Sequence, residues 1–185
     1  DHEILIVDDG STDSTGALAD DLAREFPRVR AFHQPRNQGI AAAYARALSV
    51  ARCEFVTFLP ADGEVAPFSI RAIFAAIGTA DLVVPYHANP EARQPHRRLL
   101  TWASTALVNR LFGLHLRYFQ GPVVYPTDLA RRLPTTAGGF YFLTQMLLHA
   151  LAEGHTYIQV GLMHQGRRHG FSHAVSLGKI LRALW

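Results

Sequence analysis

The stretch ILIVDDGSTDSTGALAD, from Ile4 to Asp20, indicates what kind of fold the chain adopts. Residues 3–7 form an unbroken apolar run that is typical of a buried strand. Asp8 and Asp9 follow where the run ends. Residues 14–26 then place apolar side chains on one face of a predicted helix, which Pro27 ends. The acid pair therefore lies at a junction between a strand and a helix.

Two carboxylates at such a junction have several possible uses. They can bind a metal ion, or accept hydrogen bonds from ribose hydroxyls and a base N–H. A plainer use is to cap the helix, and Asp13 or Ser14 can do this. Because two adjacent carboxylates exceed the need of one cap, we expect at least one to have a functional role.

The same alternation continues along the first half of the chain. The pattern predicts strands over 3–7, 29–33, 55–59 and 81–85, and helices over 14–26, 39–51 and 67–77. This order predicts an α/β fold with a mainly parallel central sheet and helices on both faces. Ligands of such sheets bind outside the carboxyl ends of the strands. The acidic loops at 8–9 and 62–64 are therefore expected to face one crevice.

After Asn89 the pattern changes to a polar loop with two prolines. Helices are predicted over 99–112 and 139–153, and a strand over 157–162. The segment FQGPVVYPTDLARRLP mixes a strand or turn with a short helix. Residues 177–185 predict a last helix, either an ordinary terminal helix or one that lies on a membrane.

Composition narrows the class of protein. The chain has 185 residues, of which 49% are hydrophobic and 18% charged, so we expect one globular domain over 1–185. The single Cys53 excludes an internal disulfide framework and a cysteine zinc site. No uncharged apolar run is long enough for a membrane span. The chain opens directly on a strand without Met, and we expect it to be part of something longer.

Charge divides the chain into two halves. Residues 1–91 carry 13 acids and 7 Arg, a balance of −6, whereas residues 92–185 carry 2 acids, 10 Arg and 1 Lys, a balance of +9. An acidic half suits a metal site, and a basic half suits phosphates, an anionic lipid surface or nucleic acid.

Five segments in order resemble the family-2 inverting glycosyltransferases, and within them the dolichyl- or polyprenyl-phosphate mannosyltransferase-like branch. They are VDDGSTDST, NQGIAAAYARAL, FVTFLPADGE, QGPVVYPTDLARRLP and GHTYIQVGLMHQGRRHGFS. The resemblance covers nearly the whole chain and implies a nucleotide-diphospho-sugar transferase fold of the GT-A type. The family's first strand has no counterpart before Asp1, and we therefore expect the sequence to be truncated at this end.

The resemblance also implies roles for single residues. The nucleotide would contact residues that end the first and third strands: Val7, Asp8, Asp9 and Ala61. Asp62 and Glu64 would meet Mg²⁺ or Mn²⁺ and the sugar diphosphate. Basic and hydroxyl groups of the second half, Arg98, Arg167 and Ser172, would hold the acceptor or its phosphates, and Arg167 with Asp62 would be catalytic.

Several positions depart from the family's pattern. Pro60 stands where the first Asp of D-x-D is usual. Tyr86 or His87 stands where an Arg is common after the next strand. Gln145 and Gln159 replace two later glutamates. These departures indicate a divergent branch with a different acceptor.

The physical chemistry fits the implied activity. A nucleotide diphosphate leaves only when its charge is neutralised, as a divalent cation and Arg groups can do. The resemblance implies transfer of mannose or glucose, with inversion, from a GDP- or UDP-hexose to a lipid phosphate. It also implies a cytoplasmic protein, peripheral at the inner face of the cell membrane, that binds no nucleic acid. A phosphate acceptor needs no strong general base.

Three other classes of protein share features with this chain. A signalling receiver domain would need a Lys at a strand end, but the only Lys is Lys179 in the last predicted helix. A catalytically weak or inactive sugar-nucleotide or lipid-phosphate binding module is consistent with Pro60. A nucleic-acid binder would use the basic half, which lacks interleaved aromatics. For the helix at 39–51 we expect Gly39 to serve packing against the sheet, with phosphate binding as the alternative.

Overall fold

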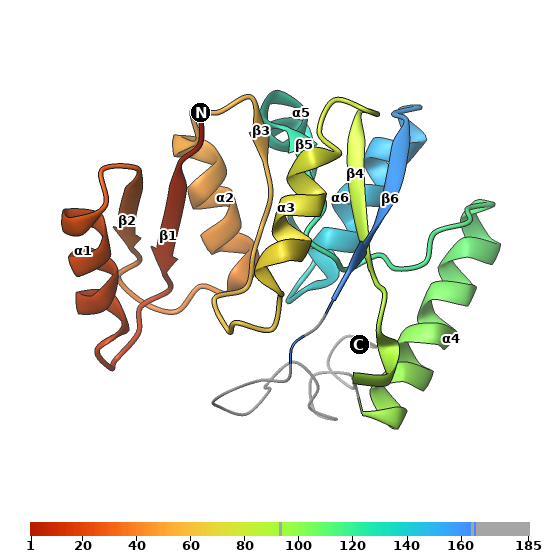
Figure 1. The fold of residues 1–185 in the computed structure, drawn as a ribbon, viewed down its shortest axis with the longest axis horizontal. Helices are drawn as coiled ribbons and strands as arrows, with labels where there is room; N and C mark the ends of the chain where they lie inside the picture. Colours follow the sequence, from red (N-terminus) through yellow and green to blue (C-terminus); the bar gives the residue numbers. More distant parts are fainter. Residues whose placement is uncertain (93, 164, 166–185) are drawn as a thin grey trace.

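The computed structural model describes residues 1–92, 94–163 and 165, in which strands and helices alternate (Figure 1). The strands are β1 (Ile4–Asp8), β2 (Val29–His33), β3 (Phe55–Val56), β4 (Leu82–His87), β5 (Tyr125–Pro126) and β6 (Tyr157–Leu162). The helices are α1 (Thr15–Glu25), α2 (Ile40–Val50), α3 (Pro67–Ala75), α4 (Pro95–Phe112), α5 (Thr127–Arg132) and α6 (Tyr141–Ala152), with a 3₁₀ turn at Pro90–Ala92.

The strands pair in three ladders. β1 and β2 are parallel, with Asp8 opposite His33, and β4 and β6 are also parallel. β3 and β5 are antiparallel. A single bridge between Val83 and Val124 connects β4 to the segment that leads into β5, so that β3, β5, β4 and β6 follow one another. The expected α/β class with parallel strands and helices on both faces is confirmed.

The central sheet is less continuous than expected. Within residues 1–92 and 94–163, no ladder joins β1 to β3, and β3 ends at Val56 instead of Leu59. Pro126 lies opposite Phe55 and has no N–H to donate, which limits the length of this ladder. Thr57 instead donates its hydroxyl to the carbonyl oxygen of Pro122 at 2.8 Å.

The core lies on both faces of β4 and β5. Leu82, Val84 and Tyr125 point to one face, which α2, α5 and α6 cover. Val83 and Val124 point to the other face, where they pack with Ile73 of α3 and Leu162 of β6. This alternation with period two is what places helices on both sides.

Most predicted boundaries hold within a few residues. The predicted strands 29–33 and 157–162 coincide with β2 and β6. α4 starts at Pro95, four residues before the expected start, because proline suits the first position of a helix and does not only mark loops. The predicted helix 177–185 lies outside the described residues. No helix of the described part of the chain has both the length and the hydropathy that crossing a bilayer requires.

Candidate functional site

Asp8 ends β1 and, at 7% exposed, is the only charged residue that is buried within the described part of the chain. Its carboxylate accepts a hydrogen bond from the backbone N–H of Ser11 at 3.0 Å and contacts Nδ1 of His33 at 3.1 Å. Bonds from the hydroxyl and N–H of Ser11, together with His33, lower the pKa of Asp8 to about 2. Asp8 therefore stays ionised and fixes the start of the loop that follows β1.

His33 connects Asp8 to α1. Its Nε2 lies 2.9 Å from the carboxylate of Asp20, while its Nδ1 faces Asp8. The two carboxylates, Asp20 foremost, raise the pKa of His33. His33 is not among the predicted site residues. Only the register of the first two strands puts residue 33 opposite residue 8, and the sequence pattern does not fix that register.

Asp9 points to the start of α2. Its carboxylate accepts hydrogen bonds from the backbone N–H of Gln38 and Gly39, both at 2.8 Å, and from the Gln34 amide at 2.9 Å. A carboxylate has about four acceptor sites, so little capacity remains for a ligand. Asp9 thus serves first as the anion at a helix N-terminus.

Two glycines next to this carboxylate have distinct roles. Gly10 has a φ of 71°, and a Cβ there would lie 2.6 Å from the backbone of Arg36, so no other residue fits. The expectation that Gly39 permits close packing against the sheet is wrong. A Cβ there would meet nothing within 4 Å, and its φ of 90° is the reason for glycine.

The remaining residues of the first loop lie as follows. Val7 is half-buried in β1, opposite Phe32. Asp13 accepts the N–H of Thr15 at 3.0 Å, at the start of α1, and the bonds from Thr15 lower the pKa of Asp13. Of the two predicted caps, Asp13 therefore forms the capping bond, whereas Ser14 makes no side-chain cap.

The second acidic loop follows β3. Asp62 accepts the N–H of Glu64 at 3.1 Å across Gly63, which has a φ of 68°, and both acids are half-buried while Ala61 is exposed. The carbonyl oxygen of Glu64 accepts the N–H of Gln165 at 2.8 Å. The acidic turn is thereby attached to the chain that leaves β6.

These loops lie along the edge where β1, β4 and β6 end, the lower edge in Figure 1. A cavity of about 350 Å³ opens beside the start of α2 and next to the loop that precedes α6. Small side chains and backbone line it: Gln38–Ala42, Ala45 and Thr135–Gly139. Since Gln38 and Gly39 also bind Asp9, the cavity adjoins the first acidic loop.

Basic groups reach this edge from the second half. Arg98 is exposed in the first turn of α4, which begins eight residues after β4 ends. The guanidinium of Arg117 lies 4.4 Å from the ring centroid of Tyr86. The positive charge of Arg117 therefore lies beside the end of β4, where Tyr86 or His87 replaces the Arg that is usual in the family. Arg117 was not among the predicted site residues. Arg167 and Ser172 lie outside the described residues.

The acidic turn fits a divalent cation only as part of a shared coordination sphere. No group of three or more His, Cys, Asp or Glu with metal-binding geometry occurs among the residues described. Asp62 and Glu64 supply two carboxylates within one turn. Mg²⁺ takes one or two protein carboxylates and completes its shell with water and substrate phosphates, which such a turn allows.

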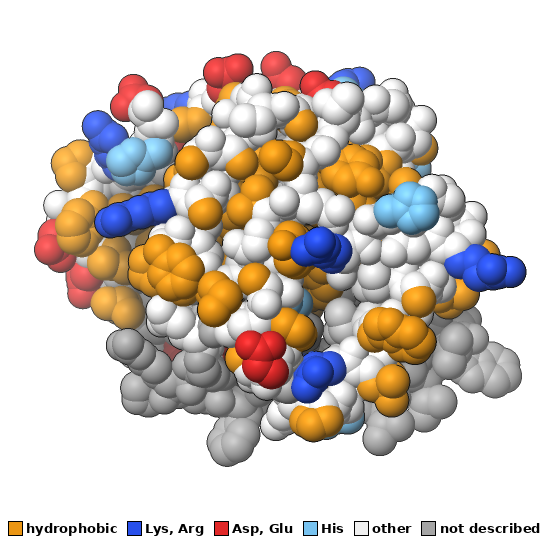
Figure 2. Space-filling model, turned by 45° about the vertical axis from the view of Figure 1, so that its right-hand side comes forward, with side chains coloured by type: hydrophobic (Ala, Val, Ile, Leu, Met, Phe, Trp, Pro, Cys, Tyr) orange, Lys and Arg blue, Asp and Glu red, His pale blue; other side chains and the backbone are white. Residues whose placement is uncertain are grey.

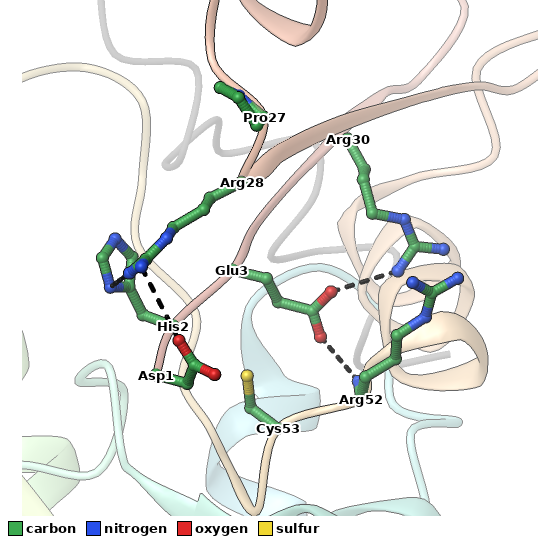
Figure 3. A pocket seen from close by; sticks show the side chains of 8 residues that line it. All are labelled: Asp1, His2, Glu3, Pro27, Arg28, Arg30, Arg52 and Cys53. Atoms are coloured by element: carbon green, nitrogen blue, oxygen red, sulfur yellow. Dashed lines mark hydrogen bonds and ion pairs between the residues drawn. The ribbon is translucent and has the colours of Figure 1, made fainter.

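A second cavity, of about 380 Å³, lies at the opposite edge, where β1 and β2 begin (Figure 3). Its charged side chains pair with one another: Arg30 contacts Glu3 at 3.1 Å, and Arg28 contacts Asp1 at 3.7 Å. It lies at the amino ends of the strands, away from both acidic loops. We therefore do not include it in the candidate site.

Comparison with known proteins identifies relatives of this chain. The family described as glycosyl transferase family 2 matches residues 1–141. The chain is 27% identical over 181 residues to an undecaprenyl-phosphate mannosyltransferase of Micrococcus luteus, a match that covers 92% of this chain and 74% of that protein. It is 30% identical over 190 residues to a polyprenol monophosphomannose synthase of Mycolicibacterium smegmatis, covering 91% and 69%.

Solved structures show the same fold. Glucosyl-3-phosphoglycerate synthase of Mycobacterium tuberculosis, in complex with Mn²⁺, UDP and glucosyl-3-phosphoglycerate, superposes with a TM-score of 0.66 at 17% identity. That match covers 91% of this chain and 62% of the other. The chain thus spans about six tenths of the length of this structural relative.

Proposed function

Because this chain belongs to glycosyl transferase family 2, we propose that it transfers a hexose, mannose or glucose, from a nucleotide diphosphate sugar to a polyprenyl- or dolichyl-type lipid phosphate. The names of the two bacterial relatives, which state polyprenyl-type acceptors and mannose, support this substrate class. We place the reaction at the inner face of the cell membrane, where a peripheral protein can meet such an acceptor.

The observation that carries the proposal is the link between the acidic turn and the end of β6. Glu64 holds Gln165 by a backbone hydrogen bond, and Ala66 donates to the carbonyl oxygen of Met163 at 3.2 Å. The acidic turn is therefore attached at Gln165, two residues before the R-x-x-G-x-S sequence begins in the chain. Acidic ligands and phosphate-binding Arg groups are the two components that a sugar diphosphate requires.

In the proposed reaction, an oxygen of the acceptor phosphate forms a bond to the anomeric carbon. The bond from that carbon to the diphosphate breaks on the opposite face, which inverts the configuration and releases a nucleoside diphosphate. The attacking oxygen is already ionised near neutral pH, so no side chain has to remove a proton.

The chain's own residues would bind and orient these groups. We assign the nucleotide to the loop of Val7, Asp8 and Asp9 and to Ala61, with Asp8 held ionised by Ser11 and His33. Asp62 and Glu64 would hold Mg²⁺ or Mn²⁺, which as a Lewis acid neutralises charge on the departing diphosphate. Arg98, Arg167 and Ser172 would bind the acceptor or its phosphate.

Transfer assays test this proposal. GDP-mannose, UDP-glucose and related donors are incubated with a short-chain polyprenyl phosphate, with Mn²⁺ or Mg²⁺ and after chelation. Chelation should abolish product, and added metal should restore it. Product formed at an equal rate in a chelator would overturn the role of the cation.

Single substitutions test the residues. Asp62→Asn should lower turnover by at least about 100-fold at unchanged thermal stability, the range seen when an electrostatic contribution to a transition state is removed. Arg167→Ala should weaken use of donor or acceptor. Asp128→Asn is the matched control, because Asp128 is exposed in the first turn of α5. Full activity of Asp62→Asn would remove this residue from the site.

A binding module is the second candidate, and one observation favours it. Pro60 replaces one acid of the turn. Calorimetric titration of the same donors distinguishes the two functions. Donor binding without turnover on any lipid phosphate would establish the module and overturn the transferase.

A further inference from the structure

The helix α4 exposes most of its large apolar side chains. It lies at one side of the molecule, at the right of Figure 1, and none of its residues is buried. The side chains concerned are more than half exposed: Leu99 64%, Leu100 53%, Trp102 69%, Leu107 58%, Leu111 69% and Phe112 58%. So many exposed apolar residues on one helix indicate an interaction site.

In an ordinary surface helix the apolar side contacts the protein and the polar side faces solvent. In α4 this arrangement is inverted. Its half-buried residues follow one another at helical spacing, and most are polar: Arg97, Thr101, Thr105, Val108 and Asn109. Asn109 anchors this inner stripe, donating from its amide to the carbonyl oxygen of Leu116 at 2.7 Å and accepting the N–H of Leu116 at 3.0 Å. The four leucines consequently lie on the opposite side of α4, and Trp102, at the margin of the inner stripe, is 69% exposed.

The charge of α4 has a single sign. Residues 95–112 include Arg97, Arg98, Arg110 and His96, and no Asp or Glu. In the lower part of Figure 2, hydrophobic and basic side chains lie next to each other, with one acidic side chain at the left of this group. A helix with Trp and Leu on its outer face and Arg beside them has the composition of helices that lie in the interface of an anionic bilayer.

We propose that the outer face of α4 is a membrane-docking surface that binds anionic phospholipid. The surface is formed by Leu99, Leu100, Leu107, Leu111 and Arg110, which share one side of the helix, with the exposed Trp102 at its margin. The charge favours a bilayer over a second copy of the chain, because two facing α4 helices would bring equal positive charges together. Trp102 is suited to the headgroup level, since its ring is apolar and its N–H is polar.

The position of α4 relative to the two acidic loops suggests what membrane docking would do for the proposed reaction. Its first turn follows the carboxyl end of β4, the edge that carries both acidic loops. Docking through α4 would bring this edge to the bilayer, where a lipid phosphate lies. This purpose rests on the proposed function, but the docking itself does not, because the assay below contains no sugar donor.

Vesicle flotation with the 185-residue chain tests the proposal. Vesicles are made of phosphatidylcholine alone or of phosphatidylcholine with phosphatidylglycerol. We expect binding to the anionic vesicles, weaker binding as salt rises, and a blue shift of Trp fluorescence that is retained in a Trp185→Phe variant, in which Trp102 is the reporter. No binding to anionic vesicles would overturn the proposal.

Two matched pairs of variants localise the contact. Leu107→Gln with Leu111→Gln should lower vesicle affinity at least about ten-fold. Leu18→Gln is the control, because Leu18 lies on α1 and is 59% exposed, against 58% for Leu107. Arg110→Gln should lower affinity about five-fold, and Arg71→Gln, exposed on α3, should not.

The outcomes are decisive in both directions. Equal loss in the Leu18 and Leu107/Leu111 variants, or no loss in either, would overturn the assignment to α4. Light scattering after gel filtration tests the remaining alternative, a dimer formed through α4. A dimer that the Leu107/Leu111 variant abolishes, without vesicle binding by the parent chain, would assign the face to a second copy and overturn the membrane proposal.

Discussion

The helices α4 and α6 have similar amounts of apolar side chain and opposite environments. In α6, Phe142, Met146 and Leu147 have no exposed surface, and Leu143 and Ala150 are also buried. In α4, which is six residues longer, no residue is buried. The amount of apolar surface on a helix therefore does not decide whether the helix enters the core.

The pattern along each helix and its anchors decide this difference. α6 presents Phe142, Leu143, Met146, Leu147 and Ala150 to the face of β4 that carries Leu82 and Val84. This is the i, i+4 spacing of a core-facing stripe. The inner stripe of α4 is polar instead and is held by Asn109. The comparison predicts that equal substitutions have unequal costs in the two helices.

The largest expected effect is that of Leu147→Ala in α6. The side chain is fully buried, and its removal leaves a cavity in the main core. We expect the free energy of unfolding to fall by about 2–5 kcal/mol. Urea or thermal unfolding followed by circular dichroism measures it. A loss below about 1 kcal/mol would show that α6 is not packed as described.

Asn109→Ala should have the second-largest effect and tests the anchor of α4. The substitution removes two hydrogen bonds and leaves the N–H and carbonyl oxygen of Leu116, 3% exposed, without their partner. We expect a loss of about 1–3 kcal/mol. Asn37→Ala, in an exposed loop, is the control. If Asn109→Ala were neutral, α4 would be held by other contacts than its polar stripe.

Much of the fold could be predicted from the sequence, because strand and helix periodicity is local. β2 and β6 coincide with the prediction, and the order of elements follows from alternating patterns. The environment of α4 could not be predicted, because it depends on which stripe faces the body. The short ladder of β3 could not either, since it depends on Pro126 being its partner, 70 residues away in the chain.

The candidate site was predictable to a lesser extent. The positions of both acidic loops follow from the rule that ligand-binding residues lie at the carboxyl ends of strands. The hydrogen bonds that occupy Asp9 depend on the backbone of Gln38 and Gly39. The sequence pattern does not fix the direction of those N–H groups. The contact between His33 and Asp8 could be predicted only from the register between β1 and β2, which the sequence pattern does not fix.

A smaller effect concerns the pH dependence of stability. The ionic contacts of His33 should depend on pH, whereas the apolar packing of α6 should not. Since the pKa of His33 is raised, its contribution is complete below its ordinary value of 6.5 and is lost as the pH rises through the raised pKa. Asp8, with its lowered pKa, stays ionised throughout this range and loses its contribution only as the pH falls towards about 2.

His33→Gln should therefore reduce the decline of the melting temperature between about pH 6 and pH 8, because glutamine keeps a hydrogen-bonding group without the charge. Leu147→Ala should shift the whole profile down with little change of shape, since the contact it removes does not titrate. His149→Gln, on the exposed side of α6, is the control. An identical pH profile for His33→Gln and the parent chain would contradict the ionic link.

The smallest expected effect on stability is that of Leu107→Ala in α4. It removes the same atoms as Leu147→Ala, but from a side chain that is 58% exposed and not from one without exposed surface. No cavity forms, and alanine is at least as good a helix former as leucine, so the free energy of unfolding should change by less than about 0.5 kcal/mol. The same unfolding experiment measures both substitutions in parallel. If Leu107→Ala cost as much as Leu147→Ala, the face of α4 would already be covered within the chain, and it would not be available to a membrane.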